Sequence, residues 1–271
     1  MSELLRRIVV IGASGQLGSD LVKAFEGLDV VSVDHAMVDI ERTAEVAAFL
    51  AHVKPSLVVN TVAVDGLAAM CEAAGIALAH ISTDYVFDGA ATEPYDESAR
   101  AAPLNVYGIS KYAGELAIAA RTERAFVFRT SGLYGVRGSS SKGYTFVERI
   151  RTQALAGMPL RVVDNIVSTP SYTRDVATTI RSVLETGRFG TYHVTNGGSC
   201  TWYEFALEIL AVSGIEARVE RTTSDSFPSF ARRPGYSVLA NNALVQAGVA
   251  AAPEWKAGLQ VYLQTSAALR N

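Results

Sequence analysis

Short apolar runs alternate with amphipathic stretches along the first half of the chain. The runs fall at residues 8–11, 30–33, 57–59, 76–81 and 125–129, and most are rich in β-branched or aliphatic side chains. Uninterrupted runs of this length are typical of strands that are buried on both faces of a parallel sheet. Each run therefore predicts one buried strand.

The stretches between the runs repeat their apolar residues at helical spacing. In the first stretch one helical face carries Leu17, Leu21, Val22 and Phe25. Asp39 is expected to cap the second helix. Further helices are expected at 64–74 and, after a loop over 88–106, from residue 107 to about residue 121. Strands that alternate with helices predict an α/β fold with right-handed crossovers and helices on both faces of the sheet.

The alternation loosens after Tyr134. Residues 137–144 are rich in glycine and serine and predict a mobile loop. Thr201 and Glu204 have the spacing of a capping box at the start of a helix. The aromatic residues that follow are expected in the core of a second lobe. The remaining elements are expected to be helices at 146–156 and 172–184 and strands at 160–163 and 191–194.

The strand at 191–194 is expected to return to the main sheet, which fixes the domain boundaries. We predict a Rossmann-type, doubly wound parallel sheet from residues 1–134 and 172–196. Residues 135–171 and 197–271 are then expected to form a smaller C-terminal substrate-binding lobe.

The composition excludes several classes of protein. With 271 residues, 49% hydrophobic content and a net charge of −3, the chain is typical of an ordinary globular protein that binds neither nucleic acid nor an anionic membrane. The apolar run before Gly12 is too short for a membrane span or a signal peptide. Cys71 and Cys200 form no disulfide framework, which favours a cytoplasmic location. The four histidines have no metal-ligand spacing.

A glycine-rich segment joins the first strand to the first helix. Gly12, Gly15 and Gly18 are spaced for a dinucleotide site, in which the backbone approaches a pyrophosphate at a helix N-terminus. The alternative is an ordinary strand-to-helix turn. Asp34 ends the second strand, where a carboxylate can bind the adenosine ribose and repel a 2′-phosphate. No arginine follows Asp34 directly, which mildly favours NAD(H), and both NADH and NADPH stay open.

Hydroxyl and carboxylate side chains follow the fourth strand, at the sheet edge where open α/β sheets bind their ligands. Thr83 is placed to hydrogen-bond and polarise a substrate carbonyl. Alternatively, Ser82 and Thr83 bond their own backbone in a turn, and Asp84 and Asp88 are turn residues. Both interpretations of the two aspartates stay open.

Tyr107 and Lys111 are four residues apart, so on a helix they share one face. A fixed ammonium beside a phenol favours the phenolate and is expected to lower the Tyr107 pKa toward neutrality. The pair would then transfer protons. On a solvated helix the same spacing is common and carries no function, so the upstream glycine segment and Thr83 support the catalytic interpretation.

Together these motifs resemble an extended short-chain dehydrogenase/reductase, and further stretches resemble the dTDP-4-dehydrorhamnose reductase family nearly from end to end. The stretches are residues 15–18, 80–89, 103–108, 129–131, 191–196, 231–234 and 237–239. The resemblance implies reduction of the C4 ketone of a nucleotide-linked 4-keto-6-deoxy sugar by NADH or NADPH. It implies that Tyr107 donates the proton, that Lys111 lowers the tyrosine pKa and binds the nicotinamide ribose, and that Thr83 orients the carbonyl.

The resemblance also implies the ligand contacts. The cofactor residues implied are Gly12, Ser14, Gly15, Gln16, Leu17, Gly18, Asp34, Asp39, Ile40, Thr61, Val62, Ala63, Tyr107 and Lys111. The substrate residues implied are Thr83, Asp84, Tyr85, Gly132 and Arg232. Arg232 and its neighbour Arg233 would bind the substrate pyrophosphate, and a surface salt bridge is the alternative.

The sequence departs from the family at two places. Gly132 stands where the family usually has a tryptophan that helps to form the sugar pocket. Residues 61–75 connect the third and fourth strands, about two dozen fewer than the family usually has there. Either this connection is trimmed or a mobile loop is absent from the sequence.

Two other functions remain open. One is a non-catalytic, NAD(P)-binding regulatory subunit of a partner enzyme, which the two departures favour and the intact Thr83, Tyr107 and Lys111 oppose. The other is a nucleotide-sugar epimerase, which would retain its NAD. The sequence does not fix the oligomeric state, and a homodimer is left open.

Overall fold

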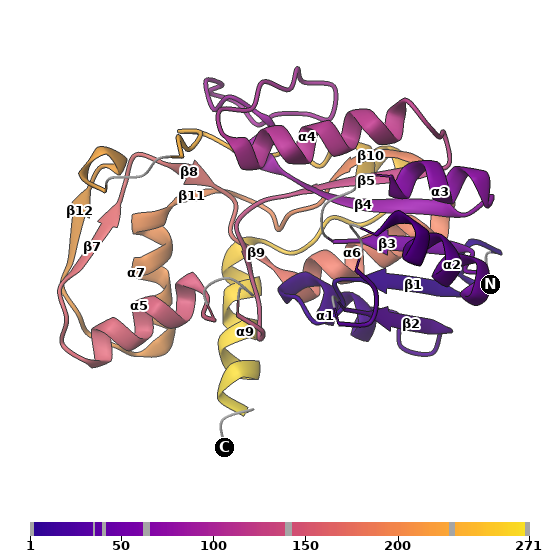
Figure 1. Ribbon diagram of the computed structural model, residues 1–271. Helices are drawn as coiled ribbons and strands as arrows, with labels where there is room; N and C mark the ends of the chain where they lie inside the picture. Colours follow the sequence, from indigo (N-terminus) through magenta and orange to yellow (C-terminus); the bar gives the residue numbers. More distant parts are fainter. Residues whose placement is uncertain are drawn as a thin grey trace.

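The computed structural model describes residues 3–34, 36–39, 42–61, 66–138, 143–227 and 231–268. Six parallel strands form the main sheet, in the order β10-β5-β4-β3-β1-β2. Figure 1 shows this sheet as one lobe, with a second lobe beside it that contains β7, β12, α5 and α7. The predicted α/β fold with a parallel sheet is confirmed.

The elements of the sheet lobe follow the predicted alternation. Its strands are β1 (Ile8–Ile11), β2 (Val30–Val33), β3 (Leu57–Asn60), β4 (Ala77–Thr83), β5 (Ala125–Thr130) and β10 (Gly190–His193). Its helices are α1 (Gln16–Ala24), α2 (Thr43–Val53), α3 (Leu67–Ala73), α4 (Val106–Ala119) and α6 (Thr173–Thr186), with 3-10 turns η1 (Glu3–Leu5) and η2 (Asp84–Val86).

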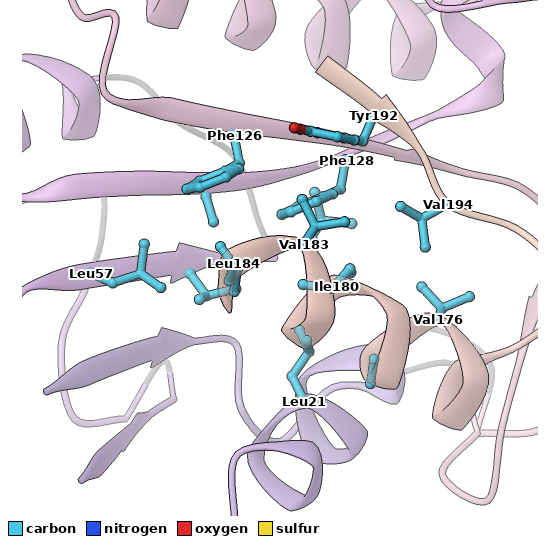
Figure 2. Close-up of a cluster of buried hydrophobic side chains, with 14 of the residues drawn as sticks. Leu21, Leu57, Phe126, Phe128, Val176, Ile180, Val183, Leu184, Tyr192 and Val194 are labelled. Carbon is cyan, nitrogen blue, oxygen red and sulfur yellow. The ribbon is translucent and has the colours of Figure 1, made fainter. Parts of the chain in front are cut away.

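The sheet is buried on both faces. Leu21 of α1 and the apolar side of α6 pack against strand residues such as Leu57 and Phe128 on one face, as Figure 2 shows. On the other face Val46 and Leu67, from α2 and α3, pack against the same strands. Burial of each such side chain is worth about 1.5–3 kcal/mol, which explains why the apolar runs predicted the strands.

Two local predictions about the segment after α1 are wrong. The run at 30–33 was expected to be buried on both faces, but β2 is the edge strand of the sheet and Ser32 is exposed. Asp39 does not cap α2, because Arg42 occupies the N-cap position. The Asp39 carboxylate lies 3.5 Å from the Arg42 guanidinium instead.

The second lobe is built from short strand pairs and three helices. It comprises β6 (Leu133–Tyr134), α5 (Phe146–Leu155), β7 (Leu160–Val163), β8 (Val167–Ser168), β9 (Ser171–Tyr172), β11 (Cys200–Thr201), α7 (Trp202–Ser213), β12 (Val219–Thr222), η3 (Ser224–Ser226) and α9 (Trp255–Ala268). The predicted capping box of Thr201 and Glu204 is present. Phe205 is buried in this lobe, and Trp202 and Tyr203 pack against its core.

The predicted boundary of the second lobe is wrong for one helix. Residues 197–271 were all assigned to that lobe, but α8 (Asn242–Ala247) packs against β10 and α6. Leu244 and Val249 belong to the core of the sheet lobe. Among the described helices, none is long and apolar enough to span a membrane.

Candidate active site

The glycine-rich segment forms a tight turn between β1 and α1. Gly12 has a φ of +78°, and Gly15 is the N-cap of α1. A β-carbon on Gly18 would lie 2.1 Å from the carbonyl oxygen of Gly12, so only glycine fits there. The turn leaves the N-terminus of α1 open at the carboxyl edge of the sheet, which is a site suited to the diphosphate of a dinucleotide.

Two side-chain hydrogen bonds join this turn to the segment around β6. The Arg137 guanidinium donates to the carbonyl oxygen of Ser14 at 3.2 Å. The Gln16 amide donates to the carbonyl oxygen of Leu133 at 3.3 Å. The Leu17 side chain, in contrast, is buried in the core of the sheet lobe, so only its backbone is available to a cofactor.

The other predicted cofactor residues lie at the ends of neighbouring strands. The Asp34 carboxylate accepts the backbone N–H groups of Ala36 and Met37 at 3.0 and 3.2 Å, which closes the turn after β2. The Thr61 hydroxyl donates to the carbonyl oxygen of Ile11 at 2.9 Å and ties β3 to β1. Ile40, Val62 and Ala63 lie outside the residues that the structure describes.

The N-terminus of α4 is fixed by Asn105. Its side-chain oxygen accepts the backbone N–H of Gly108 at 2.8 Å, and its amide donates to the carbonyl oxygen of Arg232 at 2.8 Å. A β-carbon on Gly108 would lie 2.2 Å from the carbonyl oxygen of Tyr85. This glycine therefore lets α4 approach η2, which brings Tyr107 to the end of β4.

Tyr107 contacts Tyr85 at that point. The rings of Tyr107 and Tyr85 meet edge to face with 6.0 Å between centroids, and Tyr85 is two residues after Thr83 at the end of β4. The Tyr107 side chain is 55% exposed, whereas Thr83 is buried. The structure thus brings the helix that carries Tyr107 to the end of the strand that carries Thr83.

The effect of Lys111 on Tyr107 differs from the prediction. Burial around the Tyr107 hydroxyl raises its pKa, the Thr83 hydrogen bond lowers it, and the charge of Asp84 raises it further. Burial also lowers the pKa of Lys111 to about 8, while Glu115 opposes that change. The Tyr107 pKa is therefore shifted upward, opposite to the prediction, and burial is the largest cause.

The sequence analysis missed the groups beneath Lys111. Glu115 is one turn further along the same face of α4 and forms a buried ion pair with Arg129 of β5, at 2.7 Å. The Ser82 hydroxyl also donates to Glu115. The spacing of Tyr107, Lys111 and Glu115, each four positions after the one before, was the available signal. The identity of the cation opposite Glu115 depends on the pairing of strands and could not be found from that spacing.

Asp84 is more buried than either interpretation from the sequence assumed. Its carboxylate is 4% exposed and accepts the hydroxyls of Thr83 and Ser131, each at 2.9 Å. The turn interpretation is correct for Thr83 to the extent that its hydroxyl accepts the backbone N–H of Tyr85 at 3.2 Å. Asp88 accepts the Tyr95 hydroxyl at 2.7 Å and shapes the loop that follows.

Gly132 lies in a backbone conformation that excludes a side chain. Its φ is +56°, and a β-carbon would lie 2.6 Å from the carbonyl oxygen of Thr169. A tryptophan at this position would therefore require a different backbone conformation. The departure from the family is a change of the backbone as well as the loss of one side chain. Arg232 is exposed, and no carboxylate in the described part of the chain forms an ion pair with it.

The chain matches the family described as "RmlD substrate binding domain" in two segments, residues 6–65 and 59–268. It is 34% identical to the spore coat polysaccharide biosynthesis protein SpsK of Bacillus subtilis strain 168, over 96% of this chain and 98% of that protein. It is 32% identical to a dTDP-4-dehydrorhamnose reductase of Burkholderia thailandensis, with 92% and 95% covered.

Two solved structures are similar over almost their whole length. A dTDP-4-dehydrorhamnose reductase from Clostridium acetobutylicum has a TM-score of 0.89 and 33% identity, covering 96% of this chain and 99% of that chain. The reductase from Bacillus anthracis, in complex with NADP, has a TM-score of 0.89, 31% identity and the same coverage. Its cofactor gives no support to the preference for NAD(H) that Asp34 suggested.

The two matched segments overlap at residues 59–65, which begin in the last two residues of β3 and continue toward α3. The alignment with SpsK extends over 283 positions, more than the 271 residues of this chain. The division of the match and the length of the alignment support the expectation that this connection is shorter than in relatives.

Proposed function

The chain belongs to the dTDP-4-dehydrorhamnose reductase family, and we propose that it reduces the C4 ketone of a nucleotide-linked 4-keto-6-deoxy sugar with NAD(P)H. The observation that carries the proposal is the contact of Tyr107 of α4 with Tyr85 of η2, with 6.0 Å between the ring centroids, directly after Thr83 at the end of β4. This contact lies at the same edge of the sheet as the glycine-rich turn, because the carboxyl ends of parallel strands meet there.

Each active-site residue is assigned one part of the reaction. When bound, the nicotinamide would supply a hydride to C4, which would leave negative charge on the ketone oxygen. Tyr107 donates its hydroxyl proton to that oxygen, and Thr83 orients the carbonyl. Lys111 lies one turn further along α4 and is assigned to the nicotinamide ribose and to stabilising the phenolate. General acid catalysis of this kind is worth about 10²–10⁴-fold in rate.

The substrate contacts remain proposals. Tyr85 packs against the Tyr107 ring and is assigned to one wall of the sugar site. Gly132 is assigned to the opposite side, where its backbone replaces an aromatic wall. Arg232 is exposed, and its carbonyl oxygen accepts the Asn105 amide beside the start of α4. We assign its guanidinium to the substrate diphosphate. Asp84 has its oxygens occupied by internal hydroxyls, so we assign it no direct substrate contact.

The test is cofactor oxidation when a dTDP-linked 4-keto-6-deoxy sugar is added to the purified protein, with NADH and NADPH compared. Tyr107→Phe should lower kcat by about 10²–10⁴-fold while cofactor binding, measured by fluorescence quenching, is retained. Full activity of Tyr107→Phe would remove the assigned role of the tyrosine. No oxidation with any keto-sugar of a panel would contradict the proposed reaction.

A regulatory subunit is the second candidate, because the family match divides at the short connection between β3 and α3. The discriminating observation is a stoichiometric partner that co-purifies with the protein, together with cofactor binding and no turnover. Retention of Thr83, Tyr107 and Lys111 favours the enzyme.

We further propose a cytoplasmic location, which is supported by the buried and unpaired thiols of Cys71 and Cys200. A homodimer stays a prediction, and light scattering of the purified protein measures it.

A further inference from the structure

Two successive turns follow β2 at the carboxyl edge of the sheet. The carbonyl oxygen of Asp34 accepts the backbone N–H of Val38 at 3.3 Å, and the carbonyl oxygen of Asp39 accepts the backbone N–H of Arg42 at 3.0 Å. Val38 is buried in the same cluster as Val46 of α2, and Arg42 is the N-cap residue of that helix. The turns therefore bring three charged residues, Asp34, Asp39 and Arg42, onto one short segment at the end of β2.

This segment lies where a dinucleotide-binding fold meets the adenosine ribose. In such folds the carboxylate at the end of the second strand accepts the ribose hydroxyls, and a nearby arginine accommodates the 2′-phosphate of NADP(H). The tight turn at Gly12 and Gly18, where a β-carbon on Gly18 would meet a carbonyl oxygen, fits the diphosphate. Arg42 is the first arginine or lysine after Asp34, so it is the side chain to consider as a partner of a 2′-phosphate.

Two carboxylates occupy the Arg42 guanidinium. Nη1 donates to the Glu45 carboxylate at 2.9 Å, and Nε lies 3.5 Å from the Asp39 carboxylate. An arginine binds phosphate most strongly through two neighbouring nitrogens, which are either Nε with Nη2 or Nη1 with Nη2. Each of these edges has one nitrogen that faces a carboxylate. A bidentate phosphate contact would therefore have to displace Asp39 or Glu45.

The charges of the segment disfavour a further anion. The described residues offer three carboxylates, Asp34, Asp39 and Glu45, and the single guanidinium of Arg42. One Asp34 oxygen accepts the backbone N–H groups of Ala36 and Met37, and such donors suit an ionised carboxylate. A phosphate monoester carries about two negative charges at neutral pH. Its repulsion by the carboxylates thus exceeds its attraction to the one cation.

We propose that Asp39 and Glu45, by occupying the Arg42 guanidinium, make this protein select NADH over NADPH. The inference rests on the proposed function, which takes NAD(P)H as the hydride donor, and it names the 2′-phosphate as the group that the site rejects. The relative from Bacillus anthracis was solved with NADP. The selection is therefore assigned to Asp39, Arg42 and Glu45 of this chain and not to the family.

The experiment measures binding without any sugar. ADP-ribose and 2′-phospho-ADP-ribose differ only in the 2′-phosphate, and calorimetry gives a Kd for each, with NADH and NADPH as a second pair. In both pairs the ligand without the 2′-phosphate should bind about fivefold more tightly or better. Equal affinities, or tighter binding of the phosphorylated ligand, would overturn the inference.

Neutral variants of the two carboxylates test their part in the selection. Glu45→Gln should reduce the ratio of the two Kd values by about threefold, because it weakens one partner of the guanidinium and removes one negative charge. Asp39→Asn combined with Glu45→Gln should abolish the preference. Both side chains are partly exposed, so the variants should fold. A ratio that is unchanged in the double variant would contradict the proposed role of the carboxylates.

Arg42→Met shows whether the guanidinium is withheld from the phosphate. In the double variant Asp39→Asn, Glu45→Gln, the released Arg42 should bind the 2′-phosphate, and adding Arg42→Met should remove that gain in affinity for 2′-phospho-ADP-ribose. In the wild-type background the same substitution should have a smaller effect. An equal loss in both backgrounds would mean that Arg42 already binds the phosphate, which would overturn the inference.

Asp29→Asn is the matched control for overall charge. Asp29 directly precedes β2 at its opposite end, and its carboxylate forms an exposed ion pair with Arg7 at 2.7 Å. This variant also removes one carboxylate from an arginine, but it should leave the ratio of the two Kd values unchanged. A ratio reduced as far as in Glu45→Gln would assign the selection to overall charge instead of the segment after β2.

The binding measurements also separate this inference from the proposed function. A preference for ADP-ribose and NADH that depends on Glu45, in a protein that reduces no keto-sugar, leaves the inference standing and removes the function. Reductase activity in a protein that binds NADH and NADPH equally does the reverse.

Discussion

Two nitrogens of the Arg129 guanidinium donate hydrogen bonds to the Glu115 carboxylate of α4. Nε lies 3.1 Å from Oε1, and Nη2 lies 2.7 Å from Oε2. The two side chains are 8% and 7% exposed. Lys111 is one turn away from Glu115 on α4. The ion pair therefore lies next to the lysine that is assigned to the cofactor. Such a pair orients the helix strongly, but its net effect on stability is small once desolvation is included.

Removal of one partner of this pair should be costly. Glu115→Gln leaves the Arg129 charge buried without a counter-charge, and we expect the free energy of unfolding to fall by about 3–5 kcal/mol. Urea unfolding measures this change in the free energy of unfolding. The double variant Glu115→Leu with Arg129→Met should recover most of the loss, and a double variant no more stable than the single one would contradict this explanation.

His193 should make the protein sensitive to acid. Its Nε2 faces the Arg129 guanidinium at 3.4 Å, and Nδ1 lies 3.1 Å from the Ala240 carbonyl oxygen. Arginine only donates, so Nδ1 carries the proton of the neutral ring. Burial and the charge of Arg129 lower the His193 pKa from 6.5 to about 3.

The sign of the stability change follows from that lowered pKa. Below pH 6.5 the unfolded chain takes up a proton at this residue and the folded protein does not, so stability falls as the pH falls toward about 3. At pH 5 the loss is about 2 kcal/mol from this residue. Urea unfolding of His193→Gln between pH 7 and pH 5 should lack this part of the loss. The exposed His52, changed to Gln, is the control, and equal pH dependence in all three proteins would contradict the prediction.

A side chain at position 132 should destabilise the protein and create no sugar platform. Gly132→Ala combines a left-handed backbone with a β-carbon 2.6 Å from the Thr169 oxygen, so we expect a loss of about 1–3 kcal/mol. Gly132→Trp should lose at least as much and gain nothing in kcat/KM. Gly157→Ala is the matched control, because it has a φ of +65° and no atom within 4 Å of the β-carbon. Equal losses at both positions would mean that the Thr169 contact has no effect.

Arg137 should contribute to cofactor affinity. Its guanidinium reaches the Ser14 carbonyl at 3.2 Å, beside the N-terminus of α1, where a bound diphosphate is a stronger, charged acceptor. Arg137→Met should weaken binding of NADPH and of ADP by about tenfold, equivalent to about 1.4 kcal/mol, and leave adenosine binding unchanged. Calorimetry measures all three ligands. Arg161→Met, an exposed change on β7, is the control, and equal weakening of adenosine would contradict a diphosphate contact.

The sequence predicted those parts of the fold that depend on local pattern. Each apolar run became a strand, and for all of them except the run of β2 the reason is burial on both faces, which demands continuous apolar residues. The capping box at Thr201 was found because all of its partners are three residues apart. The edge position of β2 and the return of α8 to the sheet lobe could not be found, because they depend on which distant elements pack together.

The active site, like the fold, could be predicted only where it depends on local sequence pattern. The glycine-rich turn, Thr83 and the Tyr107 helix could be located from spacing and from their place after strands. The hydroxyl groups around Asp84 come from residues 83, 131 and 237, which only the folded chain brings together. The raised Tyr107 pKa likewise depends on burial, and the spacing of Tyr107 and Lys111 carries no information about burial.

Asn105 binds the start of α4 and the segment of Arg232 with one side chain. The segment of Arg232 therefore cannot move away from α4 without breaking a hydrogen bond of the side chain that caps the helix of the proton donor. Loss of an N-cap costs about 1 kcal/mol, enough to fray a first turn that contains Tyr107. The order of the first turn of α4 is in this way coupled, through the Asn105 amide, to the position of the segment that contains Arg232.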